Sequence, residues 1–314
     1  YAAKAGKKVC VFEQHHKAGG LAGSFSRRDY VFEQSLQALI GCQPGGAIHT
    51  CRTELGLNLS FKLLDPYSRQ IGPGFDILLS SNTNQWVGEL CKLFPADAPA
   101  IRKLVADAIK IFRRIPDTPK KPQEMYTKWE KFKIGTSTLL NVGLMSKYSR
   151  VNIQDLLARE FTDPQLRTFF YSLYPVGEAS AMLLLTAIGW IGEKQLNYPV
   201  GGGQALVDSL AQAVIQNGGE IHYGRRVSNI LVDEGKARGI RLHNGVKAES
   251  EYVIAACDAM HLYGELLPHG AAPEYVLEDL GVLQPWPSYF LISLGVTEGI
   301  TEAGSWHHHI NYCP

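Results

Sequence analysis

Hydrophobic positions along the chain follow two different periods, which predicts a mixed α/β fold. Short apolar runs bounded by turn residues predict strands at 8–12 (KVCVF) and 75–79 (FDILL). Apolar residues three or four positions apart, between helix-starting and helix-ending residues, predict helices. Their expected ranges are 47–57, 82–94, 100–115, 152–160, 164–173 and 179–191.

The N-terminal strand has the surroundings of the second half of a βαβ unit. Ala2–Gly6 is interpreted as the last turn of a helix, and Glu13 follows the strand directly. In dinucleotide-binding folds, an acid at this place accepts hydrogen bonds from the adenosine ribose, and a GxGxxG loop lies about 20 residues earlier. Only twelve residues precede Glu13, so we expect a fragment that lacks this loop. A surface strand of another α/β protein would also explain Glu13 alone.

A glycine-rich turn follows six residues later. It reads Gly19-Gly20-Leu21-Ala22, and residues without a side chain let backbone amides approach a pyrophosphate closely.

A second glycine-rich segment lies far along the chain, at 198–219 (YPVGGGQALVDSLAQAVIQNGG). The glycines at 201–203 open a predicted helix, and Gly218 ends it. Strands are expected at 220–223, 226–232, 237–242 and 252–256, with a turn at Asn244-Gly245.

Together, VFEQHHKAGGLAGSF and the 198–219 segment resemble the phytoene desaturase, carotenoid isomerase and retinol saturase group of FAD-dependent oxidoreductases, within the amine-oxidase-like superfamily. The resemblance implies an α/β fold in which a truncated, Rossmann-like FAD-binding domain is interleaved with an α+β substrate domain. FAD-binding parts are expected at 1–70 and 196–265. Substrate-domain parts are expected at 71–195, which is largely helical, and at 266–314.

The resemblance also assigns cofactor-binding residues. Glu13 would hold the ribose, and Val227 would contact the adenine through its backbone. The glycine turn at Gly19, Gly20, Leu21 and Ala22 would meet the pyrophosphate, and Gly201, Gly202 and Gly203 would lie by the isoalloxazine. The chain departs from the family pattern at Leu21, where relatives often carry Arg, and at Glu33, Ser35 and Gln37, where they carry Asp, Gly and His. These departures put the substrate in doubt more than the fold.

The activity implied is that of an FAD-dependent desaturase, saturase or isomerase acting on carbon–carbon bonds of a hydrophobic polyene or isoprenoid. NAD(P) is left open as an electron partner. No catalytic residue is assigned, because the flavin itself performs the hydride chemistry. Relatives carry a further C-terminal flavin motif, so we expect the chain alone to be inactive and to bind FAD weakly or not at all. A flavin amine oxidase, and a non-catalytic binder similar to the Rab GDP-dissociation inhibitors, remain as alternatives.

The composition of the chain limits the classes of binding partner that we expect. The 314 residues carry 31 Lys and Arg against 30 Asp and Glu, so no overall field attracts nucleic acid. The basic, aromatic segment 113–133 leaves two interpretations open, a solvated linker or a peripheral membrane contact. The longest apolar run, 179–191, is too short to span a bilayer. We therefore expect a cytoplasmic protein, with peripheral membrane association left open.

Metal binding is not expected from the sequence. The six cysteines are scattered without a CxxC pair and are interpreted as reduced thiols. The triplet His307-His308-His309 would alternate between the faces of a strand, so its rings could not all converge on one ion.

Overall fold

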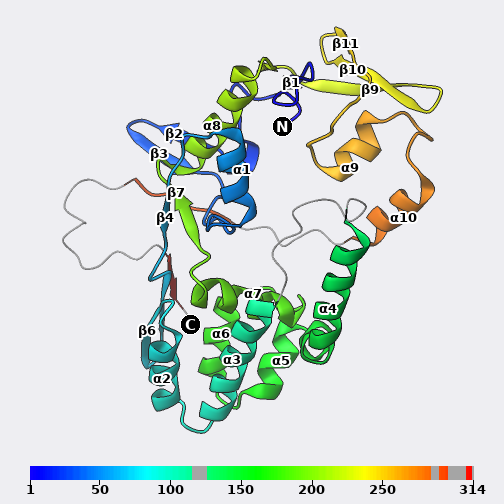
Figure 1. Ribbon diagram of the computed structural model, residues 1–314. Coiled ribbons are helices and arrows are strands. Elements are labelled where there is room, and N and C mark those ends of the chain that lie inside the picture. The colour runs from blue at the N-terminus through cyan, green and yellow to red at the C-terminus, as the bar shows by residue number, and fades with distance from the viewer. Residues whose placement is uncertain (115–125, 284–289, 296–308, 313–314) are drawn as a thin grey trace. The chain divides into compact units, whose positions relative to one another are not determined.

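The computed structural model describes residues 1–114, 126–283, 290–295 and 309–312 (Figure 1). It forms two compact units, each assembled from separate stretches of the chain. The first unit comprises Tyr1–Leu36, Leu55–Leu57 and Gly201–Ser293, and the second comprises Gln37–Glu54, Asn58–Val200 and Leu294–Pro314. Both predicted glycine motifs therefore belong to the first unit. The domain boundaries expected at 70, 195 and 265 stay a prediction.

Short strands and one long helix build the first unit. Its strands are β1 (Cys10–Phe12), β2 (Ser24–Arg27), β3 (Tyr30–Glu33), β8 (Glu220–His222), β9 (Val227–Asp233), β10 (Lys236–Leu242) and β11 (Lys247–Glu249). Its helical elements are the 3-10 turn η1 (Gly20–Ala22), α8 (Gly202–Gln216), α9 (Ala259–His261), the π-helical turn η3 (Leu262–Leu266) and α10 (Glu274–Val282).

The parallel pair of β1 and β8 is the βαβ-like part of this unit. Before β1, the Lys7 N–H donates to the Ala2 carbonyl and the Gly6 N–H donates to the Ala3 carbonyl. Gly6 has a φ of 75°, so these two bonds form the helix-ending motif that the sequence predicts. After β1 the chain returns through α8 and enters β8 beside it. Parallel strands require a crossover of this kind.

A three-stranded meander, in the order β11-β10-β9, follows β8. Glu234 and Gly235, with φ of 48° and 73°, form the tight turn between β9 and β10. The expected turn at Asn244-Gly245 is confirmed, and the Val246 N–H donates to the Asn244 side chain at 3.2 Å.

The strand expected at 252–256 is wrong, because among the described residues this stretch pairs with no other strand. The strand after the Asn-Gly turn is β11 instead. Tyr252 and Ile254 have residue types typical of strands, but they are 82% and 86% exposed, so no packing partner favours a ladder there.

The second unit is mainly helical. Its helices are α1 (Ala47–Leu55), α2 (Thr83–Leu93), α3 (Ala98–Arg114), α4 (Lys128–Ser149), α5 (Ile153–Glu160), α6 (Pro164–Ser172) and α7 (Ala181–Gly192). Its strands are β4 (Phe61–Leu63), β5 (Ser68–Gly72), β6 (Phe75–Leu79), β7 (Asn197–Pro199) and β12 (His309–Tyr312). The expected strand at 75–79 is confirmed residue for residue, and the expected helices are confirmed with ends shifted by a few residues.

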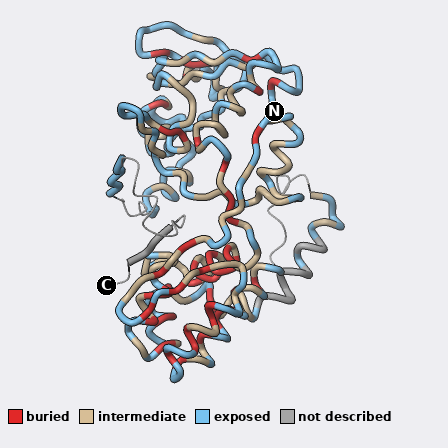
Figure 2. Tube along the Cα trace, turned by 90° about the vertical axis from the view of Figure 1, so that its left-hand side faces the viewer, coloured by how far each residue is buried: buried red, intermediate tan, exposed pale blue. Residues whose placement is uncertain are grey.

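The hydrophobic core of this unit surrounds α7, and buried residues are dense in its helices (Figure 2). Leu184, Leu185 and Ile188 are completely buried, so α7 is a core helix. It packs closely on α3, because a Cβ at Gly189 would lie only 2.7 Å from the Cβ of Phe112. No described helix is both long and apolar enough to cross a membrane.

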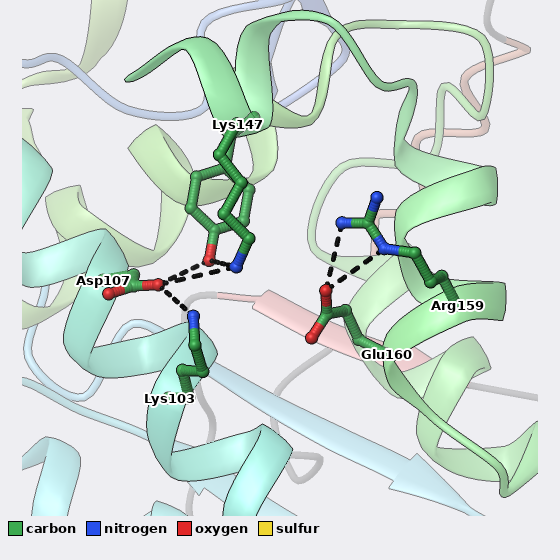
Figure 3. Close-up of polar contacts among 6 residues, drawn as sticks. Lys103, Asp107, Lys147, Arg159 and Glu160 are labelled. Atoms are coloured by element: carbon green, nitrogen blue, oxygen red, sulfur yellow. Dashed lines mark hydrogen bonds and ion pairs between the residues drawn. The ribbon is translucent and has the colours of Figure 1, made fainter. Parts of the chain in front are cut away.

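A polar network joins α3 to α4 (Figure 3). The Asp107 carboxylate accepts the Tyr148 hydroxyl at 2.6 Å and the Lys103 ammonium at 2.8 Å, while Lys147 lies 3.9 Å away. Burial alone would raise the pKa of Asp107, but these donors outweigh it and hold the pKa below its usual range. The network therefore fixes the C-terminal end of α4 against α3.

Two regions singled out in the sequence lie partly outside the described residues. Within 113–133, residues 115–125 are not described, and α4 begins at Lys128 after a capping box formed by Thr127 and Glu130. His307 and His308 are likewise outside the described residues.

Candidate functional site

Glu13 lies at the carboxyl ends of the two parallel strands. Its N–H donates to the His222 carbonyl at 2.9 Å, and its carbonyl accepts the Arg225 N–H at 2.8 Å. One carboxylate oxygen accepts the His15 N–H at 2.8 Å, and among the described residues the other oxygen has no hydrogen bond. His15 and His16, which lie between Glu13 and the glycine turn, are exposed. The carboxyl ends of parallel strands are where open α/β sheets bind ligands.

Val227 lies close along the chain to the segment that Glu13 contacts. It begins β9, is half-buried and pairs with Leu242 of β10. Arg225, two residues earlier, donates to the Glu13 carbonyl. The structure thus brings the first predicted motif and the region of Val227 together, although 214 positions separate the two residues.

The glycine turn forms the short helix η1. Gly19 and Gly20 have φ of 131° and 50°, conformations that favour glycine. A Cβ on Gly19 would also lie 2.9 Å from the Cα of Gly23, so the turn closes too tightly for a side chain there. The N–H groups of Gly20 and Leu21 form no hydrogen bond among the described residues, and the Leu21 side chain is 77% exposed. Two amides are therefore free to donate to a ligand.

The three glycines at the start of α8 serve close packing within the unit. Gly201 and Gly202 have φ of 91° and 82°. A Cβ on Gly203 would lie 2.3 Å from the Ala22 carbonyl oxygen. Glycine at this position therefore lets η1 approach the first turn of α8, which joins the two glycine motifs directly.

Glu33 reinforces this junction in a way that the sequence does not reveal. Its carboxylate accepts the Gly203 N–H at 3.0 Å and the Ser24 hydroxyl at 3.1 Å. The Ser24 hydroxyl in turn accepts the Gln204 N–H at 3.3 Å, and the Gln204 side chain accepts the Ser24 N–H at 3.2 Å. A carboxylate at a helix N-terminus satisfies free amides and the helix dipole. Side chains from β2 and β3 thus cap α8.

This cap occupies amides at the start of α8, while the expected position of Gly201 to Gly203 by the isoalloxazine stays a prediction. The amides of Gly203 and Gln204 already donate to protein side chains, so they are not open to a bound group in this arrangement. The sequence analysis singled out Glu33 only as a departure from the Asp of the family pattern, and this departure does not indicate the contact with Gly203. The contact between Ser24 and Gln204 could not be predicted either, because a contact between residues 180 positions apart produces no periodic pattern in the sequence.

Two further features, a side-chain cap in the first unit and a hollow in the second, lie apart from these residues. Asp258 caps α9, since its carboxylate accepts the His261 N–H at 3.1 Å. A hollow of about 490 Å³ is lined by α2 and α3 residues of the second unit, among them Arg102, Ile109 and Lys110, and it contains none of the predicted cofactor residues.

Comparison with known proteins gives matches over nearly the whole chain. The model of the family described as flavin containing amine oxidoreductase matches residues 3–288. The prolycopene isomerase of Daucus carota chloroplasts is 25% identical, over 97% of this chain and 51% of that protein. The phytoene desaturase (neurosporene-forming) of Cereibacter sphaeroides is 24% identical, over 83% of this chain and 50% of that protein. The chain spans about half the length of each of these relatives.

Among solved structures, an oxidoreductase from Methanosarcina mazei superposes with a TM-score of 0.56. The two chains are 20% identical, and the match covers 79% of this chain and 53% of that chain. At this identity the likeness concerns the fold alone.

Proposed function

The chain belongs to the flavin containing amine oxidoreductase family, and on that premise we propose that the protein is an FAD-dependent oxidoreductase acting on carbon–carbon bonds of a hydrophobic polyene. Family membership confirms the resemblance drawn from the two glycine motifs, together with the α/β, Rossmann-like fold class. The polyene is proposed because relatives matching most of the chain are named as a prolycopene isomerase and a phytoene desaturase.

The observation that carries the proposal is the position of Glu13. It ends a parallel strand, and its free carboxylate oxygen can accept a ribose hydroxyl. Its backbone bonds to His222 and Arg225 hold the Val227 segment alongside it. A carboxylate acceptor at the carboxyl ends of two parallel strands fits the adenosine end of FAD.

The glycine turn fits the neighbouring pyrophosphate. The free amides of Gly20 and Leu21 can donate to phosphate oxygens. Because the Leu21 side chain carries no charge, the backbone amides are the donors that this turn offers. Gly203 is less suited to touch the cofactor, since Glu33 and the Ala22 carbonyl surround it. We therefore propose that Gly201 to Gly203 act mainly by fixing η1 against α8, which holds the two free amides in place.

When bound, a flavin supplies the hydride chemistry. The part proposed for the described residues is binding and orientation: Glu13 and the Val227 backbone hold the adenosine, and the glycine turn holds the pyrophosphate. Precise orientation of two reacting groups lowers the barrier substantially, because groups that are already held in a fixed geometry do not have to meet by diffusion.

The test is anaerobic reduction of the protein-bound flavin. The polypeptide expressed from its complete open reading frame is purified with FAD and mixed with a carotenoid, a retinoid or an amine. We expect loss of the oxidised-flavin absorbance, or isomerisation of the substrate, with a polyene. Reduction by amines alone would favour an amine oxidase, the activity in the family's description. A protein that binds no flavin would favour the non-catalytic binder.

A further inference from the structure

Three side chains of metal-binding type meet on one face of the β1–β8 pair. The ligand atoms of Cys10, Glu220 and His222 all lie within 4.8 Å of one another. We propose that these three residues form a binding site for a zinc-like divalent cation that fastens β1 to β8. The site would be separate from the flavin chemistry, since none of the three is a proposed cofactor contact.

The backbone register explains why these residues meet. The parallel ladder pairs Cys10 with Glu220 and Phe12 with His222. Side chains two positions apart on a strand project from the same face, and neighbouring strands lie about 4.8 Å apart. Two ligands therefore come from β8 and one from the adjacent position on β1. The regular geometry of the two strands already places the three ligand side chains together, so binding an ion requires no movement of a loop.

The distances suit a small tetrahedral ion. Glu220 Oε2 lies 3.1 Å from His222 Nε2. Zinc bonds to oxygen and nitrogen are about 2.0–2.2 Å long, which places such a pair about 3.4 Å apart in a tetrahedron. The Cys10 sulfur lies within 4.8 Å of the ligand atoms of both Glu220 and His222. The His222 ring is stacked on Phe12, with 5.3 Å between centroids and 21° between planes, so its orientation is restricted before an ion arrives.

The donor set indicates the class of ion. A thiolate and an imidazole favour zinc and similar transition metals over magnesium and calcium, which take oxygen ligands. All three residues are exposed, so solvent can supply the fourth ligand. A bound ion would join the strand that leads into Glu13 to the strand whose His222 carbonyl accepts the Glu13 N–H.

The test is a titration of the purified chain with zinc chloride under a reductant that contains no thiol. The histidines at 307–309 are replaced by Ala in every sample, because adjacent histidines can bind zinc without a folded site. We expect saturable binding of one ion per chain. Cys10→Ser and His222→Gln should each weaken it at least about tenfold, because even the loss of an outer-shell partner of a metal ligand typically costs that much. Cys257→Ser, which removes another exposed thiol of the first unit, should leave the affinity unchanged.

Cobalt supplies a readout of the ligand itself. Cobalt bound by Cys10 should show a thiolate-to-metal charge-transfer band that Cys10→Ser abolishes and Glu220→Gln retains at weaker affinity. Circular dichroism checks that each variant remains folded. Absence of saturable zinc binding, equal affinity in Cys10→Ser, or a charge-transfer band that depends on Cys257 would each overturn the proposal.

Discussion

At the scale of single residues, the carboxylate of Glu33 connects two segments that are 170 positions apart. It accepts hydrogen bonds from Gly203 in the first turn of α8 and from Ser24 of β2. Removing it leaves an amide and a hydroxyl without their acceptor in a partly buried setting, which costs more than the loss of an average hydrogen bond. Glu33 therefore matters to the stability of the first unit, whatever it does near a ligand.

We expect Glu33→Ala to lower the free energy of unfolding of the first unit by about 2 kcal/mol. Glu33→Gln should cost less, because its amide oxygen can still accept the Gly203 N–H. Urea unfolding followed by circular dichroism measures both. The matched control is Glu251→Ala, an exposed residue in the same unit, for which a change within about 0.5 kcal/mol is expected. Equal effects of the two Ala variants would contradict the capping role.

Asp97 shows the same principle in the second unit. Its carboxylate accepts the Thr162 N–H at 3.0 Å, the Thr162 hydroxyl at 2.9 Å and the Asp163 N–H at 3.0 Å. Asp97 lies directly before α3, but its side chain bonds the loop before α6 and not the start of α3. Burial alone would raise the pKa of Asp97, but these bonds and the charge of Arg167 hold it below the usual value.

This lowered pKa makes stability depend on pH in a defined direction. A depressed carboxyl pKa contributes stability above the unfolded-state value of about 3.9, and the contribution is lost as the pH falls through the lower folded-state value. We therefore expect the urea midpoint of the second unit to fall from about pH 5 downwards, and Asp97→Asn to show a smaller slope. Asp97→Asn should also lose about 2 kcal/mol at neutral pH.

The matched control for Asp97 is Asp76→Asn. Asp76 pairs with Arg69 on the surface, and its side chain is 49% exposed, so solvent screens the pair. We expect a much smaller change in the pH slope than for Asp97→Asn. Indistinguishable pH profiles of the wild type and Asp97→Asn would contradict the account.

At the scale of elements, the crossing of α3 and α7 depends on glycine. We expect Gly189→Ala to lower the free energy of unfolding by about 1–2 kcal/mol, because the new Cβ would meet the Phe112 Cβ, which cannot move without the helix. Gly192→Ala should be close to neutral, since its nearest neighbour is the flexible end of Ile109. Thermal unfolding compares the two.

Gly88 of α2 provides the control for helix propensity. No atom lies within 4 Å of a Cβ built there, so Gly88→Ala should stabilise the protein by about 0.5–1 kcal/mol. A stabilising Gly189→Ala of similar size would show that the helices do not approach as closely as described.

Element positions could be predicted where the local pattern also determines the packing. The apolar run at α7 and the helical spacing of apolar residues at α3 both predicted helices, and both helices contribute to the hydrophobic core. The stretch 252–256 has the residue types of a strand but no partner among the described residues, and β-propensity depends on that partner. The short strand β11, in contrast, is polar and was missed.

At the scale of the whole molecule, the sequence singled out the two glycine segments that contact each other in the first unit, but not the bonds that join them. Glycines with a positive φ, such as Gly19 and Gly201, leave a readable sign because other residues avoid that conformation. The Glu33–Gly203 bond and the grouping of Cys10 with His222 leave no such sign in the sequence. They arise from strand register and from the docking of α8, and a single sequence does not encode these pairings locally.

Glu13 is the residue proposed to hold the adenosine end of FAD. The most direct measurement is the FAD dissociation constant, by isothermal titration, of the polypeptide expressed from its complete open reading frame. We expect Glu13→Gln to raise it about tenfold, because a charged acceptor of ribose hydroxyls is lost, while the exposed Glu251→Gln leaves it unchanged. An FAD affinity that Glu13→Gln leaves at the wild-type value would contradict the account.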